Sequence, residues 1–194
     1  MISLPPRFTP ESGDSSAFSP SSKPARVLAD AVKHHRSGSL DRAETLYRFL
    51  LERAGDHPDV LHLLGVIGYQ TGHPAQALPL IDAAISRAAT VADYHNNRGL
   101  VLARLGRAAE AIDSFNRAIG INPGFVDAYS NRGNAQQSLG RLPEAIGSYR
   151  QAIALQPRHA EAHNNLGNAL RRSREFLAAI EHWRQAIALR PDYH

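Results

Sequence analysis

Asparagine recurs at a fixed interval in the second half of the chain, at Asn97, Asn131 and Asn165, each step being 34 positions. A primary amide offers both a hydrogen-bond donor and an acceptor, which matches one peptide group of an extended ligand. Neighbouring helices pack about 8 to 10 Å apart, and an extended chain rises about 3.3 Å per residue. One asparagine per helix could therefore contact every third residue of a bound peptide.

Further polar residues are expected on the same helix faces as this column. The candidate peptide-binding residues are then Asn97, Asn131, Asn165, Asn96, Asn134, Asn164, Asn168, Asp93, Asp127 and Glu161. The three acidic residues among them are expected to disfavour acidic ligands, because like charges repel. In the alternative interpretation, the asparagines are solvated or bond to neighbouring helices and bind no ligand.

Other side chains that could do chemistry form no complete site. His159, Glu161 and His163 make an H-x-E-x-H run, and two imidazoles four residues apart on a helix share a face. His159 is expected in the turn before the helix, so we predict no metal site. Cysteine is absent, which excludes thiol catalysis and thiolate ligands. No G-x-S-x-G elbow or phosphate-binding glycine loop occurs. We therefore predict no catalytic residue and no cofactor, hence a chain that is not an enzyme.

The 34-residue interval extends to residue types that shape helix packing. Glycine, alanine and proline recur at it, and the repeating glycines are Gly65, Gly99, Gly133 and Gly167. Small residues let two helix axes come close, while proline ends a helix. The period divides the chain into the predicted units 24–57, 58–91, 92–125, 126–159 and 160–193. The first unit is degenerate, since Ala31 and Leu50 replace the glycine and an alanine of later units.

Each unit is predicted to be a pair of helices joined by a glycine turn. In the third unit, residues 93–105 form the first helix, Gly106 ends it in a left-handed conformation, and residues 108–121 form the second. Arg174 takes the place of that glycine in the last unit, so it must adopt a left-handed conformation or change the turn. Pro79 is expected inside a helix, where it removes a hydrogen bond.

Small, aromatic and proline residues repeating every 34 positions resemble the tetratricopeptide repeat. The resemblance runs from about residue 24 to the end. It implies an all-α fold, a right-handed superhelical solenoid of five helix-turn-helix units with about ten helices, whose hollow side is a groove for protein ligands. The asparagine column, at Asn97, Asn131 and Asn165 only, is similar to the asparagine ladder of the O-linked N-acetylglucosamine transferase and SPINDLY group. The first two units depart from it, with Ala29 and Leu63.

Composition places the chain among ordinary globular proteins. It has 194 residues, 43% of them apolar and 21% charged, and no apolar run nears the roughly 18 residues that span a membrane. We expect no membrane association and a cytoplasmic location, because no secretory signal is recognisable. Arginine and alanine usage suggests a bacterial source. Residues 1–23, rich in serine and proline, are predicted to be a disordered arm.

Three functions follow, of which the first is a non-catalytic protein-interaction scaffold that binds a peptide or protein partner. The second is the recognition arm of a larger glycosyltransferase, sulfotransferase or methyltransferase, since residues 31–51 followed by residues 56–72 resemble the start of such bacterial repeat proteins. The third is RNA binding, for which Arg171, Arg172 and Arg174 form the one dense basic cluster, but the net charge of +4 is dispersed. Self-association through an uncapped C-terminal end is also expected.

Overall fold

The computed structural model describes residues 23–191, and these form ten α-helices without any strand. They are α1 (Lys23–Arg36), α2 (Leu40–Ala54), α3 (Pro58–Gln70), α4 (Pro74–Arg87), α5 (Ala92–Arg104), α6 (Ala108–Ile121), α7 (Val126–Ser138), α8 (Leu142–Leu155), α9 (Ala160–Arg172) and α10 (Phe176–Leu189). The all-α prediction of about ten helices is confirmed. The predicted disordered arm lies outside the described residues, except that Lys23 begins α1.

The turns inside the helix pairs form as the glycine pattern predicts. Gly38, Gly72, Gly106 and Gly140 all have positive φ, between 74° and 83°, a conformation that costs glycine little because it has no Cβ. Arg174 occupies the same place in the last pair and has φ 64°. Of the two alternatives predicted for Arg174, the structure shows the first: the residue adopts the left-handed conformation and the turn is unchanged.

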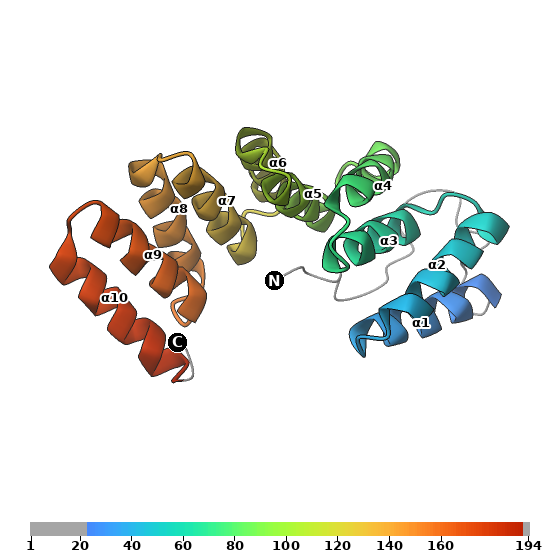
Figure 1. Ribbon diagram of the computed structural model, residues 1–194, viewed down its shortest axis with the longest axis horizontal. Helices are drawn as coiled ribbons and strands as arrows, with labels where there is room; N and C mark the ends of the chain where they lie inside the picture. Colours follow the sequence, from blue (N-terminus) through green and yellow to red (C-terminus); the bar gives the residue numbers. More distant parts are fainter. Residues whose placement is uncertain (1–22, 192–194) are drawn as a thin grey trace. The chain divides into compact units, whose positions relative to one another are not determined.

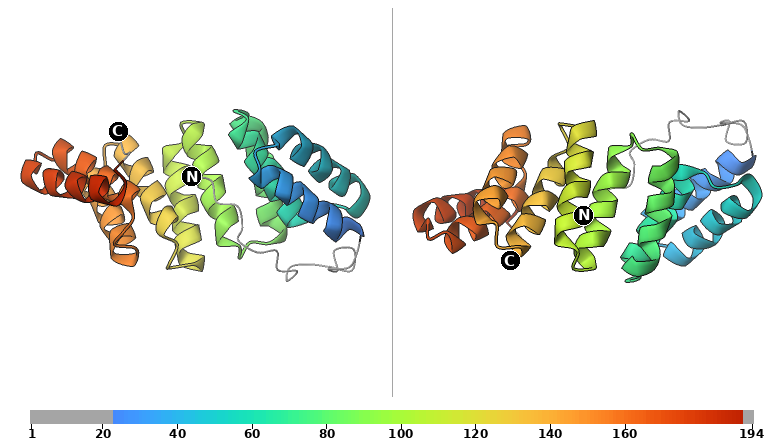
Figure 2. Two further views of the ribbon diagram at one scale, coloured as in Figure 1. Left: turned by 90° about the horizontal axis from the view of Figure 1, so that it is seen from below. Right: turned by 90° about the horizontal axis from the view of Figure 1, so that it is seen from above.

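Consecutive helices pack against one another within two compact units, which meet in sequence between Leu105 and Gly106. The N-terminal unit contains α1 to α5 and the C-terminal unit contains α6 to α10, and Figure 1 shows the helices of each unit side by side in chain order. Figure 1 shows α9 and α10 side by side as an antiparallel pair, and Figure 2 shows the chain from two further sides. The regular period gives no signal for the division into units.

The core of the N-terminal unit explains why its first repeat departs from the others. Ala31 and Leu50, the two exceptions to the repeat pattern, are both buried in one cluster with Tyr47 and Val60. The larger Leu50 fills space where later repeats have alanine. Pro79 lies inside α4, as predicted.

In the C-terminal unit, glycine allows an aromatic ring to lie directly on the preceding helix. A Cβ added to Gly133 of α7 would lie 2.5 Å from Cε1 of Tyr149, whose side chain on α8 is wholly buried. Aromatic residues recur at the 34-residue period, and of these Tyr47, Phe115 and Tyr149 are fully buried, whereas Trp183 is only partly buried. Trp183 stands on α10, which no later helix covers among residues 23–191.

Gly133→Ala is expected to destabilise the protein by about 1 to 3 kcal/mol, because the new methyl group overlaps a buried ring that cannot move away. The matched control is Gly147→Ala on α8, where nothing lies within 4 Å of the added Cβ. That variant should gain about 0.5 to 1 kcal/mol from helix propensity. Urea unfolding of both variants measures the difference, and equal effects of the two substitutions would contradict the packing assigned to Gly133.

Candidate functional site

The predicted binding residues stand on the first helix of three pairs, α5, α7 and α9. Each first helix also contacts the first helix of the neighbouring pair in its unit, α5 with α3 and α9 with α7. Part of the predicted binding face is covered by these contacts. The ten candidate residues therefore differ in exposure.

In the N-terminal unit, two of the predicted ligand-binding asparagines lie inside the protein. Asn97 and Asn96 are 0% exposed. Nδ2 of Asn97 donates to Nε2 of His62 on α3 at 2.9 Å, and its Oδ1 accepts from Nδ2 of Asn96 at 3.3 Å. These two asparagines connect α5 to α3 and present no surface to a ligand, so the prediction for them is corrected. Asp93 is partly exposed.

His62, which sequence reasoning did not select, is the centre of this buried polar cluster. Its ring stacks on Tyr94 with 4.4 Å between ring centroids, and the Tyr94 hydroxyl donates to Asp59. Burial lowers the pKa of His62 to about 3, and the nearby His35 acts in the same direction. The ring is therefore neutral, and its Nδ1 has no hydrogen-bond partner among the described residues. One indication of this role was present in the sequence, since His62 stands 34 positions before Asn96, at the equivalent place in the preceding repeat.

In the C-terminal unit, two predicted residues form a linked pair. Nδ2 of Asn165 on α9 donates to Oδ1 of Asn134 on α7 at 3.1 Å, and the buried Tyr149 hydroxyl donates to the same oxygen at 2.7 Å. Both amide groups are thereby held in a fixed orientation. Nδ2 of Asn134, a donor, and Oδ1 of Asn165, an acceptor, make no hydrogen bond within residues 23–191. Asn134 is exposed and Asn165 is partly exposed.

The remaining predicted residues of this unit surround the pair unequally. Asn131 is only 8% exposed, whereas Asn164, Asn168 and Glu161 on α9 are partly exposed. The structure therefore does not present Asn97, Asn131 and Asn165 as one column of equally open amides. It joins Asn165 to Asn134 instead.

Asp127 lies at the start of α7 and is held by a histidine from the next helix pair. Nε2 of His159 donates to Oδ1 of Asp127 at 3.3 Å, while Nδ1 of His159 accepts from the N–H of Ala162 at 3.0 Å and caps α9. This hydrogen bond lowers the pKa of Asp127, against the opposing effect of burial. Asp127 therefore stays ionised, and His159 lies before the helix, as predicted.

The two histidines of the H-x-E-x-H run make hydrogen bonds to different partners. Nε2 of His163 donates to the carbonyl of Pro157 at 3.0 Å, and its Nδ1 accepts from Nδ1 of His182 at 3.1 Å. Within residues 23–191 no three histidine or carboxylate side chains are grouped as metal ligands would be. The same residues contain no helix that is long and apolar enough to cross a membrane.

Comparison with known protein families identifies the repeats. Models described as the tetratricopeptide repeat match residues 31–90, 69–124 and 160–193, and a model described as the TPR repeat matches residues 138–173. A search of curated protein sequences gives no significant match.

Solved structures share the fold at low sequence identity. A crystal structure of MamA is 23% identical with a TM-score of 0.74, covering 86% of this chain and 91% of that one. A MamA structure from Desulfovibrio magneticus is 19% identical with a TM-score of 0.77, covering 88% and 97%. YrrB, described as a TPR protein with an unusual peptide-binding site, is 22% identical with a TM-score of 0.69, covering 86% of each chain.

Proposed function

Since the chain belongs to the tetratricopeptide repeat family, we propose that it is a protein-interaction scaffold whose C-terminal unit binds an extended peptide through Asn134 and Asn165. The observation that carries this proposal is the fixed donor and acceptor pair that these two amides present. The description of YrrB as a peptide-binding repeat protein supports the same class of ligand.

The pair has the chemistry to bind peptide backbone. In an extended chain, the N–H and C=O groups of one residue point to the same side, so one residue can donate to Oδ1 of Asn165 and accept from Nδ2 of Asn134. Such contacts do not depend on the ligand side chain. Glu161 and the ionised Asp127 on the same helices add negative charge. We therefore expect neutral or basic peptides to bind better than acidic ones.

The test starts from peptides selected on the wild-type protein from a random displayed library. Asn134→Asp keeps the oxygen that accepts from Tyr149 and Asn165 but replaces the outward donor by a second oxygen, so binding should weaken at least tenfold, about 1.4 kcal/mol. Asn165→Ala should have a similar effect. Gln151→Ala, which removes an exposed amide on α8, is the matched control and should bind as the wild type does.

Fluorescence anisotropy with a labelled selected peptide measures these affinities, and circular dichroism checks that the variants keep their helices. Wild-type affinity in folded Asn134→Asp and Asn165→Ala variants would overturn the proposal. The recognition arm of a larger transferase would use the same face to bind its substrate, so this experiment applies to that alternative as well.

A second interaction surface is the outer side of α10, where we propose that a second copy of the chain binds. Ile146 of α8 is covered by α9 and is 7% exposed, whereas Ile180, one repeat later, is 42% exposed. Phe176, Ile180 and Ile187 recur at helical spacing, and Leu177 beside them is 85% exposed. This apolar face supports the expected self-association.

The charges at this face favour a second copy over an unrelated partner. Glu181 and Arg184 flank the apolar residues. If two α10 helices pair antiparallel about a two-fold axis near residue 182, Glu181 of each copy lies opposite Arg184 of the other. One helix face then complements itself in both charge and hydrophobicity.

Light scattering coupled to gel filtration should show a dimer that the double variant Leu177→Glu/Ile180→Glu converts to a monomer, because each partner would bury two carboxylates without counter-ions. Leu155→Glu, at a position 45% exposed on α8, should leave the dimer intact. A wild-type protein that stays monomeric at every concentration tested would contradict this expectation.

A further inference from the structure

Guanidinium groups fill the space between neighbouring helix pairs at two places in this chain. In the C-terminal unit, Nε of Arg132 on α7 donates to Oγ of Ser148 at 3.0 Å, and its Nη1 donates to Oδ1 of Asn116 at 2.9 Å. Arg132 thus connects α8 with α6. In the N-terminal unit, Nε of Arg98 on α5 donates to Oδ1 of Asp82 on α4 at 2.6 Å.

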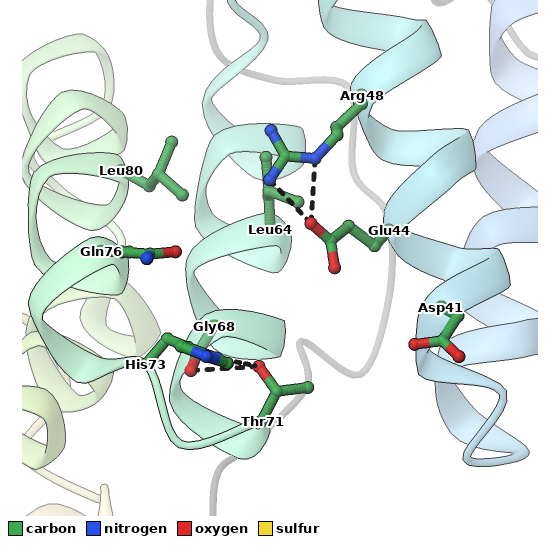
Figure 3. A pocket seen from close by; sticks show the side chains of 9 residues that line it. All are labelled: Asp41, Glu44, Arg48, Leu64, Gly68, Thr71, His73, Gln76 and Leu80. Carbon is green, nitrogen blue, oxygen red and sulfur yellow. Dashed lines mark hydrogen bonds and ion pairs between the residues drawn. The ribbon is translucent and has the colours of Figure 1, made fainter.

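The corresponding space between α2 and α4 is open. In the C-terminal unit, Gln136 also helps to fill the equivalent space, because its Oε1 accepts from Oγ of Ser148 at 2.7 Å. Two repeats earlier in the sequence, Leu64 takes the place of Arg132 and Gly68 takes the place of Gln136. The space between α2 and α4 therefore lacks both long polar side chains, and Leu80 takes the place of Ser148. A cleft of about 280 Å³ remains above α3. Figure 3 shows it with its lining residues.

The cleft combines an apolar floor with an acidic rim. Leu64, Gly68 and Leu80 line its inner side, and Asp41 and Glu44 of α2 line its edge. Nε and Nη2 of Arg48 both donate to Oε1 of Glu44, at 2.9 and 2.7 Å, which leaves Oε2 of Glu44 to accept from another group. The lining holds two carboxylates, Asp41 and Glu44, and one guanidinium, Arg48, and Figure 3 shows Asp41 apart from the Glu44–Arg48 pair. With these three groups ionised, the cleft carries one net negative charge.

We propose that this cleft binds the side chain of one arginine supplied by a protein partner. The aliphatic stem of that arginine lies along Leu64 and Leu80, and its guanidinium donates to Oε2 of Glu44 and to Asp41. Arginine fits better than lysine because its planar group can donate to two carboxylates at once. The inference goes beyond the peptide-binding face, which stands on the other unit and uses neutral amides.

The full chain is titrated with acetyl-arginine amide while the backbone amide signals of Gly68 and Thr71 are followed by nuclear magnetic resonance. We expect saturable shifts of both signals, at least tenfold weaker binding of the neutral isostere acetyl-citrulline amide, and weaker binding of free arginine, whose carboxylate is repelled by Asp41 and Glu44. Absence of shifts at these two residues would overturn the proposal. Equal affinity for the citrulline compound would overturn it as well, and tighter binding of free arginine would overturn the assignment to a protein partner.

Two variants test the cleft without depending on one another. Leu64→Arg/Gly68→Gln introduces the residues that fill the C-terminal unit, and a Cβ on Gly68 would make an ordinary contact of 3.4 Å with Ala77. This double variant should abolish the shifts, whereas Leu155→Arg, which adds the same charge at a distant exposed site, should not. Asp41→Asn leaves the cleft open and should weaken binding at least threefold. Unchanged binding in a folded form of either cleft variant would contradict the assigned site.

Discussion

Tyr149→Ala is expected to lower the free energy of unfolding of the C-terminal unit by about 3 to 5 kcal/mol, as for other buried aromatic residues. The ring is wholly buried in a cluster with Ile146, Leu166 and Leu170, and it lies on Gly133. Removing it leaves a cavity that the backbone of two helices cannot close. Urea unfolding followed by circular dichroism measures the loss.

Two controls separate the ring from its hydroxyl and from a general effect of substitution. Tyr149→Phe keeps the ring and removes only the hydroxyl, which donates to Oδ1 of Asn134 at 2.7 Å and to Oε1 of Gln137 at 3.5 Å, so it should cost about 0.5 to 1.5 kcal/mol. Leu155→Ala, at an exposed position, should change stability by no more than about 0.5 kcal/mol. A Tyr149→Ala loss no larger than that of Tyr149→Phe would show that the ring is not part of the core.

Acid is expected to destabilise the N-terminal unit through His62. The pKa of this histidine is about 3 in the folded protein, against 6.5 for an unperturbed histidine. Between these two values the unfolded chain binds a proton that the folded protein does not bind. The stability contributed by neutral His62 is therefore complete above pH 6.5 and falls by about 1.4 kcal/mol for each pH unit below it.

His62→Asn should make the stability less sensitive to acid, because asparagine does not titrate and occupies the same repeat position at Asn96 and Asn164. Between pH 6 and pH 4, the loss of unfolding free energy should be smaller in this variant by about 2 to 3 kcal/mol. An exposed control that does not titrate, Gln151→Ala on α8, should leave the pH dependence of stability as it is in the wild type. Urea unfolding at a series of pH values measures the free energy of unfolding of each protein. If this free energy fell equally with pH in the wild type and in His62→Asn, the assignment of a buried, neutral His62 ring would be contradicted.

The helices could be predicted from the sequence because the signals that define them are local. Glycine at Gly72 or Gly106 fixes a left-handed turn within a few residues, and the repeat period assigns the equivalent turn to Arg174. Pro74 and Pro143 stand in the first turn of α4 and α8, where a missing N–H costs little. Each of these residues acts on its own backbone, so no knowledge of distant contacts is needed.

The site could be predicted only in part because its hydrogen bonds join residues far apart in sequence. A helical pattern shows that Asn97 and Asn165 occupy equivalent positions, but not which side chain faces each of them across the helix contact. The partner of Asn97 is the buried His62, and the partner of Asn165 is the exposed Asn134. The amide of Asn97 is therefore inaccessible and that of Asn165 is partly exposed, although the two residues occupy the same position in their repeats.

The most direct test of the proposed function is a scan of a selected peptide in which each backbone N–H is replaced in turn by N-methyl, compared with an alanine scan of the same peptide. If Asn134 and Asn165 bind the backbone, methylation at one internal residue should weaken binding at least tenfold, whereas alanine at that residue should change it less than threefold. Binding that tolerates every N-methyl group but is lost on alanine substitution would contradict backbone recognition by this pair.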